Sequence, residues 1–138
     1  MDDVLMVKTL AGILAGRTGW AWKPGGPAYA PGEVGIFYGA IASSPDQAVG
    51  LTPYAIGDDI ENGLATRRVQ VRFRGTPGDP TGADRLAGEA FAAVQGLVRV
   101  AGLSEVSRVS SAQLGPDGNG RQERTDNYQI ILDNPEAF

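Results

Sequence analysis

The chain of 138 residues contains neither histidine nor cysteine. Without cysteine it has no disulfide framework and no thiolate metal site. Without histidine it lacks the Ser-His-Asp and Cys-His catalytic arrangements, and zinc loses both of its preferred ligands. Carboxylates, lysine, serine, tyrosine and arginine remain as possible catalytic groups. The composition therefore disfavours an enzyme, and we expect no cofactor and no metal.

The sequence also lacks a basic excess and a long apolar run. Its formal net charge is −4, whereas proteins that wrap DNA or RNA normally carry a basic stripe. No apolar run approaches the roughly 20 residues that span a bilayer, so we expect no membrane partner. The acidic start, Met1-Asp2-Asp3, is unlike a secretory signal. We expect a protein that is made and used in the cytoplasm or in an assembly built there.

Length and patterning predict one domain over residues 1–138, which begins with a helix. Met6, Leu10, Ile13 and Leu14 form one helical stripe between Asp2 and about Gly16. A long loop rich in proline and glycine follows at about residues 23–32. Loops of this length commonly serve a function or become ordered by a partner.

Residues 66–74 form the clearest predicted strand. Val69, Val71 and Phe73 alternate with arginine and glutamine, which places the apolar set on one face of a sheet. Further strands are predicted over residues 48–54, 105–114 and 122–132, the last two joined as a hairpin through the turn Gly115–Gly120.

A second helix is predicted between the two pairs of strands. Asp79 is the expected N-cap, Pro80 the first helical residue and about Leu97 the last, with an apolar, alanine-rich stripe along one side. The order is helix, strand, strand, helix, strand, strand. It predicts an α+β fold in which two helices pack on one face of a largely antiparallel four-stranded sheet.

Three groups of residues invite a catalytic or ligand-binding interpretation. The glycine clusters lack the GK[ST] ending of a phosphate loop, and the turn at Asp117 has an arginine where a calcium loop needs an oxygen ligand; both are better explained as plain turns. Asp58, Asp59 and Glu61 resemble an acid–base or metal cluster, but their glycine and asparagine neighbours favour a solvated loop.

The arginines of the predicted strands form a candidate contact surface. One face of the strand predicted over residues 66–74 carries Arg68, Arg72 and Arg74. The C-terminal hairpin carries Arg121 and Arg124. One interpretation is a solvated outer face. The other is an interface, because arginine suits bidentate pairing with carboxylates and the same chain supplies acidic loops. Basic and acidic surfaces on one molecule suit a head-to-tail ring.

Three short motifs carry a family resemblance. Residues 45–54 read PDQAVGLTPY, residues 69–75 read VQVRFRG, and residues 118–128 contain NGR, ER and NY in the pattern NGRxERxxNY. In this order, with the alanine-rich helix between them, they resemble the minor capsid or tail terminator proteins of long-tailed bacteriophages. The resemblance covers roughly residues 33–133.

The resemblance implies a structural virion protein without catalytic residues. Members of the family form a hexameric ring at the head-proximal end of the tail tube, which stops tube polymerisation and joins the tail to the head connector. The implied partners are further copies of the chain, the tail tube protein and the head-side connector protein. Genomic DNA would pass through without specific binding, and assembly would occur in the host cytoplasm.

Three alternatives remain open from the sequence. A head–tail connector or neck adaptor would also form a ring and would differ in the neighbour that it contacts. A small carboxylate-dependent hydrolase would hold Asp58, Asp59 or Glu61 in a closed pocket. A cellular binding module of unknown ligand is the third. The residues favour an assembly subunit over an enzyme, and the resemblance specifies which one.

Overall fold

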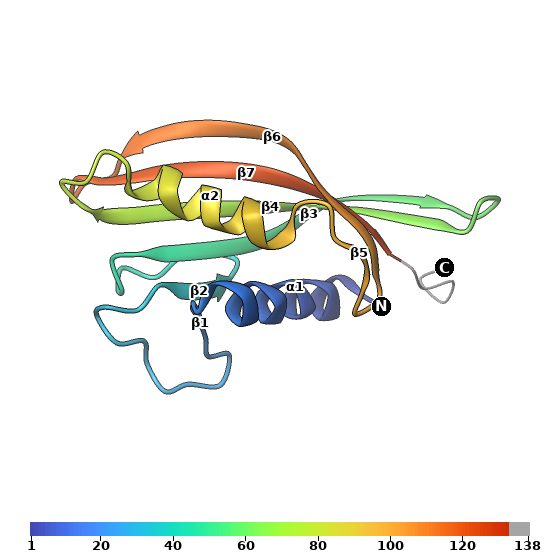
Figure 1. Cartoon of the computed structure of the whole chain (residues 1–138), viewed down its shortest axis with the longest axis horizontal. Coiled ribbons are helices and arrows are strands. Elements are labelled where there is room, and N and C mark those ends of the chain that lie inside the picture. Colours follow the sequence, from blue (N-terminus) through green and yellow to red (C-terminus); the bar gives the residue numbers. More distant parts are fainter. Residues whose placement is uncertain (133–138) are drawn as a thin grey trace.

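The computed structural model describes residues 1–132, which form a curled sheet with two helices (Figure 1). The strands follow the order β1-β2-β3-β4-β7-β6-β5 across the sheet. The elements are α1 (Asp3–Thr18), β1 (Ala21–Trp22), β2 (Gly35–Tyr38), β3 (Ala48–Asp59), β4 (Leu64–Pro77), α2 (Gly82–Val94), β5 (Val98–Val100), β6 (Leu103–Pro116) and β7 (Arg121–Leu132).

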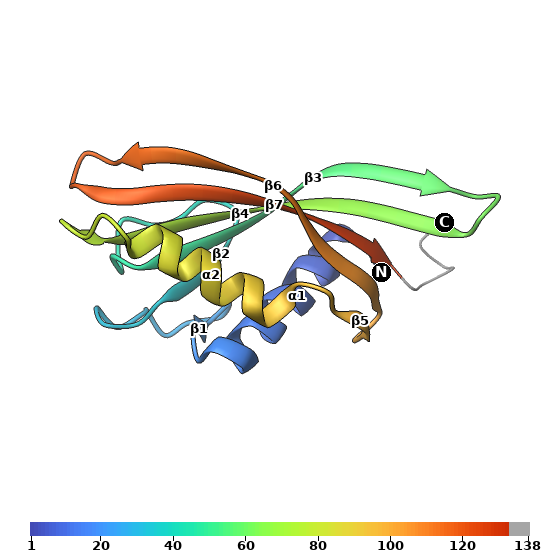
Figure 2. The ribbon, with the colours of Figure 1, turned by 45° about the horizontal axis from the view of Figure 1, so that its top comes forward.

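The predicted α+β class is confirmed, but the predicted four-stranded, largely antiparallel sheet is wrong. The sheet has seven strands and is mixed, because β1 pairs with β2 and β2 with β3 in parallel. The three strands that the sequence pattern missed, β1, β2 and β5, are two to four residues long. Strands this short carry too few alternations to be recognised. The sheet curls into half a barrel around the helices (Figure 2).

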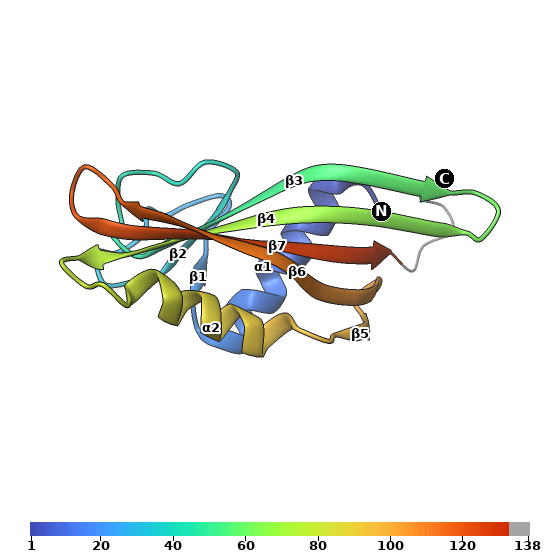
Figure 3. The same cartoon turned by 90° about the horizontal axis from the view of Figure 1, so that it is seen from above.

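The acidic loop predicted between the strands at residues 48–54 and 66–74 is also shorter than expected. Strand β3 continues to Asp59 and β4 already begins at Leu64. The two strands form a long hairpin that extends beyond the rest of the sheet at one end (Figure 3). We call residues 55–68 of this hairpin the β3–β4 arm; its base still pairs with β7, where Ala65 lies opposite Leu132, and its tip extends past that point. Its strands stay paired to the end, with Asp59 opposite Leu64.

Helix α1 begins where Asp2 accepts a hydrogen bond from the backbone N–H of Leu5, at 2.8 Å. It ends at Gly19, whose φ of 83° is the left-handed conformation that glycine adopts without penalty. Helix α2 begins at Gly82, two residues later than the predicted start at Pro80. A Cβ on Gly75 would lie 2.8 Å from the Cα of Gly82, so the two glycines let α2 start against the backbone of β4.

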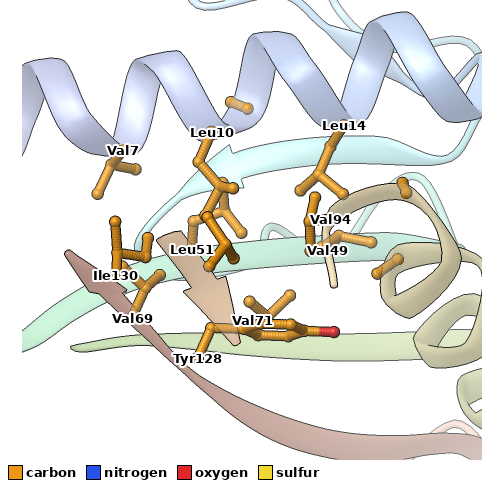
Figure 4. Packing of buried hydrophobic residues seen from close by; sticks show 14 of the residues in the cluster. Val7, Leu10, Leu14, Val49, Leu51, Val69, Val71, Val94, Tyr128 and Ile130 are labelled. Carbon is orange, nitrogen blue, oxygen red and sulfur yellow. The ribbon is translucent and has the colours of Figure 1, made fainter. Parts of the chain in front are cut away.

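Both helices bury their apolar stripes against the same side of the sheet. Val7, Leu10 and Leu14 of α1 point at Val49 and Leu51 of β3 and at Ile130 of β7 (Figure 4). Tyr128 and Val71 lie beneath them, and Val94 contributes from α2 (Figure 4). One continuous apolar core therefore joins the N-terminal helix to the C-terminal strand. The opposite side of the sheet has no helix among the described residues.

The connection from β2 to β3, residues 39–47, is here called the crossover segment. Two parallel neighbours need such a connection, because the chain must return to the end of the sheet where it started. It passes so close to β3 that a Cβ on Gly50 would lie 2.5 Å from the carbonyl oxygen of Gly39. Glycine at position 50 therefore makes room for the crossover segment.

Candidate subunit interface

Three arginines of β4, Arg68, Arg72 and Arg74, lie on the side of the sheet away from the helices. Their strand neighbours Val69, Val71 and Phe73 are buried, while Arg68 and Arg72 are exposed, as the alternation predicted. The adjoining positions on β7 and β6 include the carboxylate of Glu123 and uncharged residues such as Asn127, opposite Gln70, and Ser110, opposite Asn127. The free side of the sheet is therefore polar, and arginine side chains supply its positive charge.

Arg72 and Arg68 are the two arginines of this surface that stay accessible. Arg72 binds Glu123 of β7 in a bidentate pair, with Nε–Oε1 at 2.9 Å and NH2–Oε2 at 3.1 Å. Arg68 makes one longer bond, from NH2 to Oε1 of Gln129 at 3.3 Å. Exposed pairs of this kind contribute at most about 1 kcal/mol to folding. Both guanidinium groups can therefore exchange these partners for groups on another molecule.

Arg74 is held by the crossover segment. It is 5% exposed, and it donates to the carbonyl oxygens of Ala42, Pro45 and Asp46 at 2.7, 2.7 and 2.9 Å. None of these partners is a carboxylate. Burial, and then the nearby charge of Arg121, lowers the pKa of Arg74. This arginine is fully engaged inside its own chain.

Arg121, at the start of β7, also binds the crossover segment. Its NH1 donates to the carbonyl oxygen of Ser43 at 2.8 Å and to Oδ1 of Asp46 at 3.2 Å, and its Nε donates to Asp117 at 2.8 Å. Asp117 also accepts from the backbone N–H groups of Arg121 and Asn119, both at 2.9 Å. These bonds, the backbone one from Arg121 first, lower the pKa of Asp117. The turn of the C-terminal hairpin is therefore tied to the crossover segment.

Arg124 lies on the opposite side of the sheet from Arg68 and Arg72. It pairs with Phe73 in register, binds Asp126 at 2.8 Å and reaches Asp84 of α2 at 3.2 Å. Asp126 is fully buried. The five arginines that the sequence grouped therefore divide into an exposed pair, two that hold the crossover segment and one that binds α2.

The three acidic residues of the candidate site lie at the end of the β3–β4 arm. Asp58 pairs with Arg67 at 2.7 Å, and Asp59 accepts from the backbone and side-chain nitrogens of Asn62 at 3.2 and 2.7 Å. These hydrogen bonds, that from the Asn62 side chain first, lower the pKa of Asp59. Glu61 is in the turn itself and is exposed. The three carboxylates line none of the described pockets.

Arg67 is a residue that the sequence pattern did not select. It sits between Ala65 and Val69 on the helix side of β4, is 6% exposed, and also binds Asp3 of α1 at 3.0 Å. It links the base of the arm to the start of α1 through two carboxylates. The sequence does contain a signal for it. Arg67 stands at a position that is in phase with the apolar Val69 and Val71, so two consecutive arginines interrupt the alternation of apolar and polar residues.

The family comparison agrees with this geometry. The family model of the bacteriophage tail terminator protein matches residues 13–134. The chain belongs to the bacteriophage tail terminator family. The match begins in α1 and includes β3, β4 and the β6–β7 hairpin, which carry the three motifs. No curated protein matches the sequence.

A tail terminator acts as part of the tail, and in this one an edge of the sheet is open beside β5. Strand β5 pairs with β6 only over Leu103–Glu105. Beyond it, residues 109–114 of β6 are all exposed, carry no charge, and have no neighbour on that side among the described strands. Natural proteins usually protect such an edge with charge or proline. Here the register of β6 shifts between Arg108 and Ser110 and between Gln113 and Gly115, but the stretch between these shifts carries no charge.

Two further observations on this tail terminator concern metal sites and membrane-spanning helices. Within residues 1–132, no three side chains of the metal-ligating types are grouped to hold an ion. No helix in the same range is long and apolar enough to cross a membrane.

Proposed function

We propose that the protein forms a ring on the head-proximal end of the phage tail tube. The ring stops tube polymerisation and joins the tail to the head connector. Family membership supports a structural role in the tail. The observation that carries the proposal beyond this is the β3–β4 arm, which extends past the rest of the sheet and exposes Ile60 at its end (Figure 3).

The projecting arm and the open stretch of the β6 edge are separate surfaces of one chain, and each can meet a different neighbouring copy. When one surface of a subunit binds a different surface of the next, the contact is heterologous and closes into a ring if the rotation allows. The arm lies at one end of the sheet, and the exposed stretch of β6 lies towards the other (Figure 3). This separation supports a head-to-tail arrangement, for which we propose the six-fold ring that the family resemblance implies.

The distribution of charge supports free passage of DNA through such a ring. The net charge is −4, and the arginines of the sheet are mostly bonded within the chain: Arg67, Arg72, Arg74, Arg108, Arg121 and Arg124. Arginines that are already paired release few counterions on meeting phosphate, so they hold DNA weakly. We propose that the exposed pair, Arg68 and Arg72, faces protein neighbours and not the lumen.

The proposed partners are further copies of the chain, the tail tube protein and the head-side connector protein. The deciding experiment polymerises the purified tube protein with and without this protein and measures tube length and tube ends by negative-stain electron microscopy. We expect short tubes that each carry one ring-shaped cap. Unchanged tube length, together with binding to connector rings, would instead identify a neck adaptor.

Charge reversal tests the proposed role of the arginine surface. In Arg68→Glu/Arg72→Glu we expect loss of ring mass by light scattering or loss of tube capping, with the fold retained because both side chains are exposed. A matched control reverses Arg99, which is exposed on β5 at the far edge of the sheet. Rings and caps that survive the double reversal would remove these arginines from the interface.

A further inference from the structure

An apolar groove opens beside α1, on the opposite side of the molecule from the free sheet surface. It has a volume of about 530 Å³ and is lined by residues of α1, of β1 and β2 and of the loop between them. Val4 and Lys8 come from the first turns of α1, Trp22 and Lys23 from the end of β1, and Phe37 and Tyr38 from β2. We call it the α1–β2 groove.

The lining of the α1–β2 groove is mainly apolar, includes the two cations Lys8 and Lys23, and contains no carboxylate. Lys23 binds Glu33 at 2.7 Å. Lys8 has no ion pair within residues 1–132 and is exposed. Val4 and Tyr38 remain 46% and 43% exposed although they line an apolar surface. An occupant that suits this groove is apolar and carries negative charge at its sides.

The tip of the β3–β4 arm has these properties. Ile60 is 79% exposed, more than any other large apolar side chain described, and Asp59 and Glu61 flank it. Asp59 fixes the turn through Asn62, whereas Glu61 has no partner within residues 1–132 and is available to a cation. Ile56, 63% exposed, extends the apolar surface along the arm.

The tip does not reach the groove of its own chain. The tip of the arm extends past the body along the sheet, whereas the groove lies beneath the sheet, between β1 and β2 and the first turns of α1 (Figures 1 and 3). A complementary pair of surfaces that point in different directions on one chain serves two copies. The opposite charges of the two surfaces favour this pairing over a like-charged one.

We propose that the tip of the β3–β4 arm docks into the α1–β2 groove of the next copy. Ile60 enters the groove between Val4 and Tyr38, and Glu61 pairs with Lys8. This proposal rests on the ring proposed above and names the contact that closes it. Each copy donates one arm and accepts one, so no arm and no groove is left unused in a closed ring.

The absence of native cysteine allows a direct test by disulfide trapping. Ile60→Cys in one copy and Val4→Cys in a second, distinguishable by a tag, are mixed and oxidised, alone and on capped tubes. A disulfide forms only when the two Cα atoms come within about 7 Å. We expect the mixed pair to cross-link at least ten times faster than Val98→Cys mixed with Val4→Cys. Val98 is the matched control, because it is 65% exposed on β5, away from the arm.

A second measurement follows association of the full chain by sedimentation over a range of concentrations. We expect Ile60→Asp to weaken association about 30-fold, the effect of failing to bury one isoleucine, and Val98→Asp to leave it unchanged. Lys8→Glu weakens association by repelling Glu61, and the combination Lys8→Glu/Glu61→Lys restores it. Because all of these positions are exposed, the variants keep their fold, which circular dichroism checks.

The outcomes separate this proposal from the proposed function. Tubes that are capped normally by Ile60→Asp, with no trapping between positions 60 and 4, overturn the docking contact and leave the terminator function in place. Trapping of position 60 to the tube protein in place of a second copy also overturns it. Rapid trapping and charge-swap rescue without any effect on tube length support the contact and count against the function.

Discussion

Replacing Arg74 by methionine removes the guanidinium that binds the crossover segment and keeps an unbranched side chain of similar reach. The substitution breaks three hydrogen bonds to the carbonyl oxygens of residues 42, 45 and 46. A hydrogen bond contributes about 1 kcal/mol net, and more when the donor is charged. The free energy of unfolding should therefore fall by about 3 kcal/mol in Arg74→Met, which corresponds to a fall in Tm of about 10 °C for a chain of this size.

Urea unfolding monitored by tryptophan fluorescence measures this loss, because Trp20 is buried against the core and reports the folded state. Arg68→Met is the control on the same side of the same strand. It loses a single bond of 3.3 Å at an exposed position and should cost less than about 0.5 kcal/mol. A loss in Arg74→Met that is no larger than in Arg68→Met would refute the idea that the crossover segment depends on this arginine.

Three further predictions concern the same fold. Gly50→Ala places a methyl group 2.5 Å from a carbonyl oxygen of the crossover segment, and calorimetry should show a loss of about 1–3 kcal/mol; Gly57→Ala, whose nearest atom is 3.8 Å away, should show almost none. Because hydrogen bonds lower the pKa of Asp117 from 3.8, its stabilisation is complete above that pH and is lost below it. Urea midpoints at pH 3 and pH 6 should therefore differ less in Asp117→Asn than in the wild type. Burial, and then the charge of Asp126, raises the pKa of Tyr128 from 10.0 to about 12. Folding favours the neutral phenol, so this stabilisation is fully present below the pKa of the unfolded chain and is lost as the pH rises through the pKa of the folded one. The phenolate absorbance step at the highest pH should therefore disappear in Tyr128→Phe.

The long regular elements were predictable because their periodicity is local. The alternation of Val69, Val71 and Phe73 predicted β4, and the apolar stripe of residues 83–97 predicted α2 to within a few residues. The continuation of β3 through Asp58 and Asp59 was missed because acidic residues next to glycine resemble a solvated loop. Asp58 pairs with Ala65 in the hairpin, and its carboxylate binds Arg67. Arg67 also binds Asp3 of α1, a tertiary contact that no local pattern contains.

The sequence predicted which residue types form the candidate site and on which side of the sheet three of its arginines lie. It did not predict which of the arginines other parts of the chain cover. Alternation placed Arg68, Arg72 and Arg74 on the side away from the core, as observed. It did not indicate that residues 39–47 fold back over Arg74 and Arg121, because that segment lies 28 to 78 positions away in the chain. The α1–β2 groove was also unpredicted, since it combines residues of a helix, a loop and a strand too short to show a pattern.

The hydrogen bonds that hold the crossover segment have a consequence for the order in which the chain folds. Arg74 binds it across 28 to 32 positions, and Arg121 binds it across 75 and 78 positions. Contacts this distant form only after the intervening chain has closed a large loop. The segment follows directly on Tyr38, which lines the α1–β2 groove. A nascent chain in which β7 has not yet been synthesised therefore lacks the bonds from Arg121, and the segment that follows β2 is fully held only once the chain is complete.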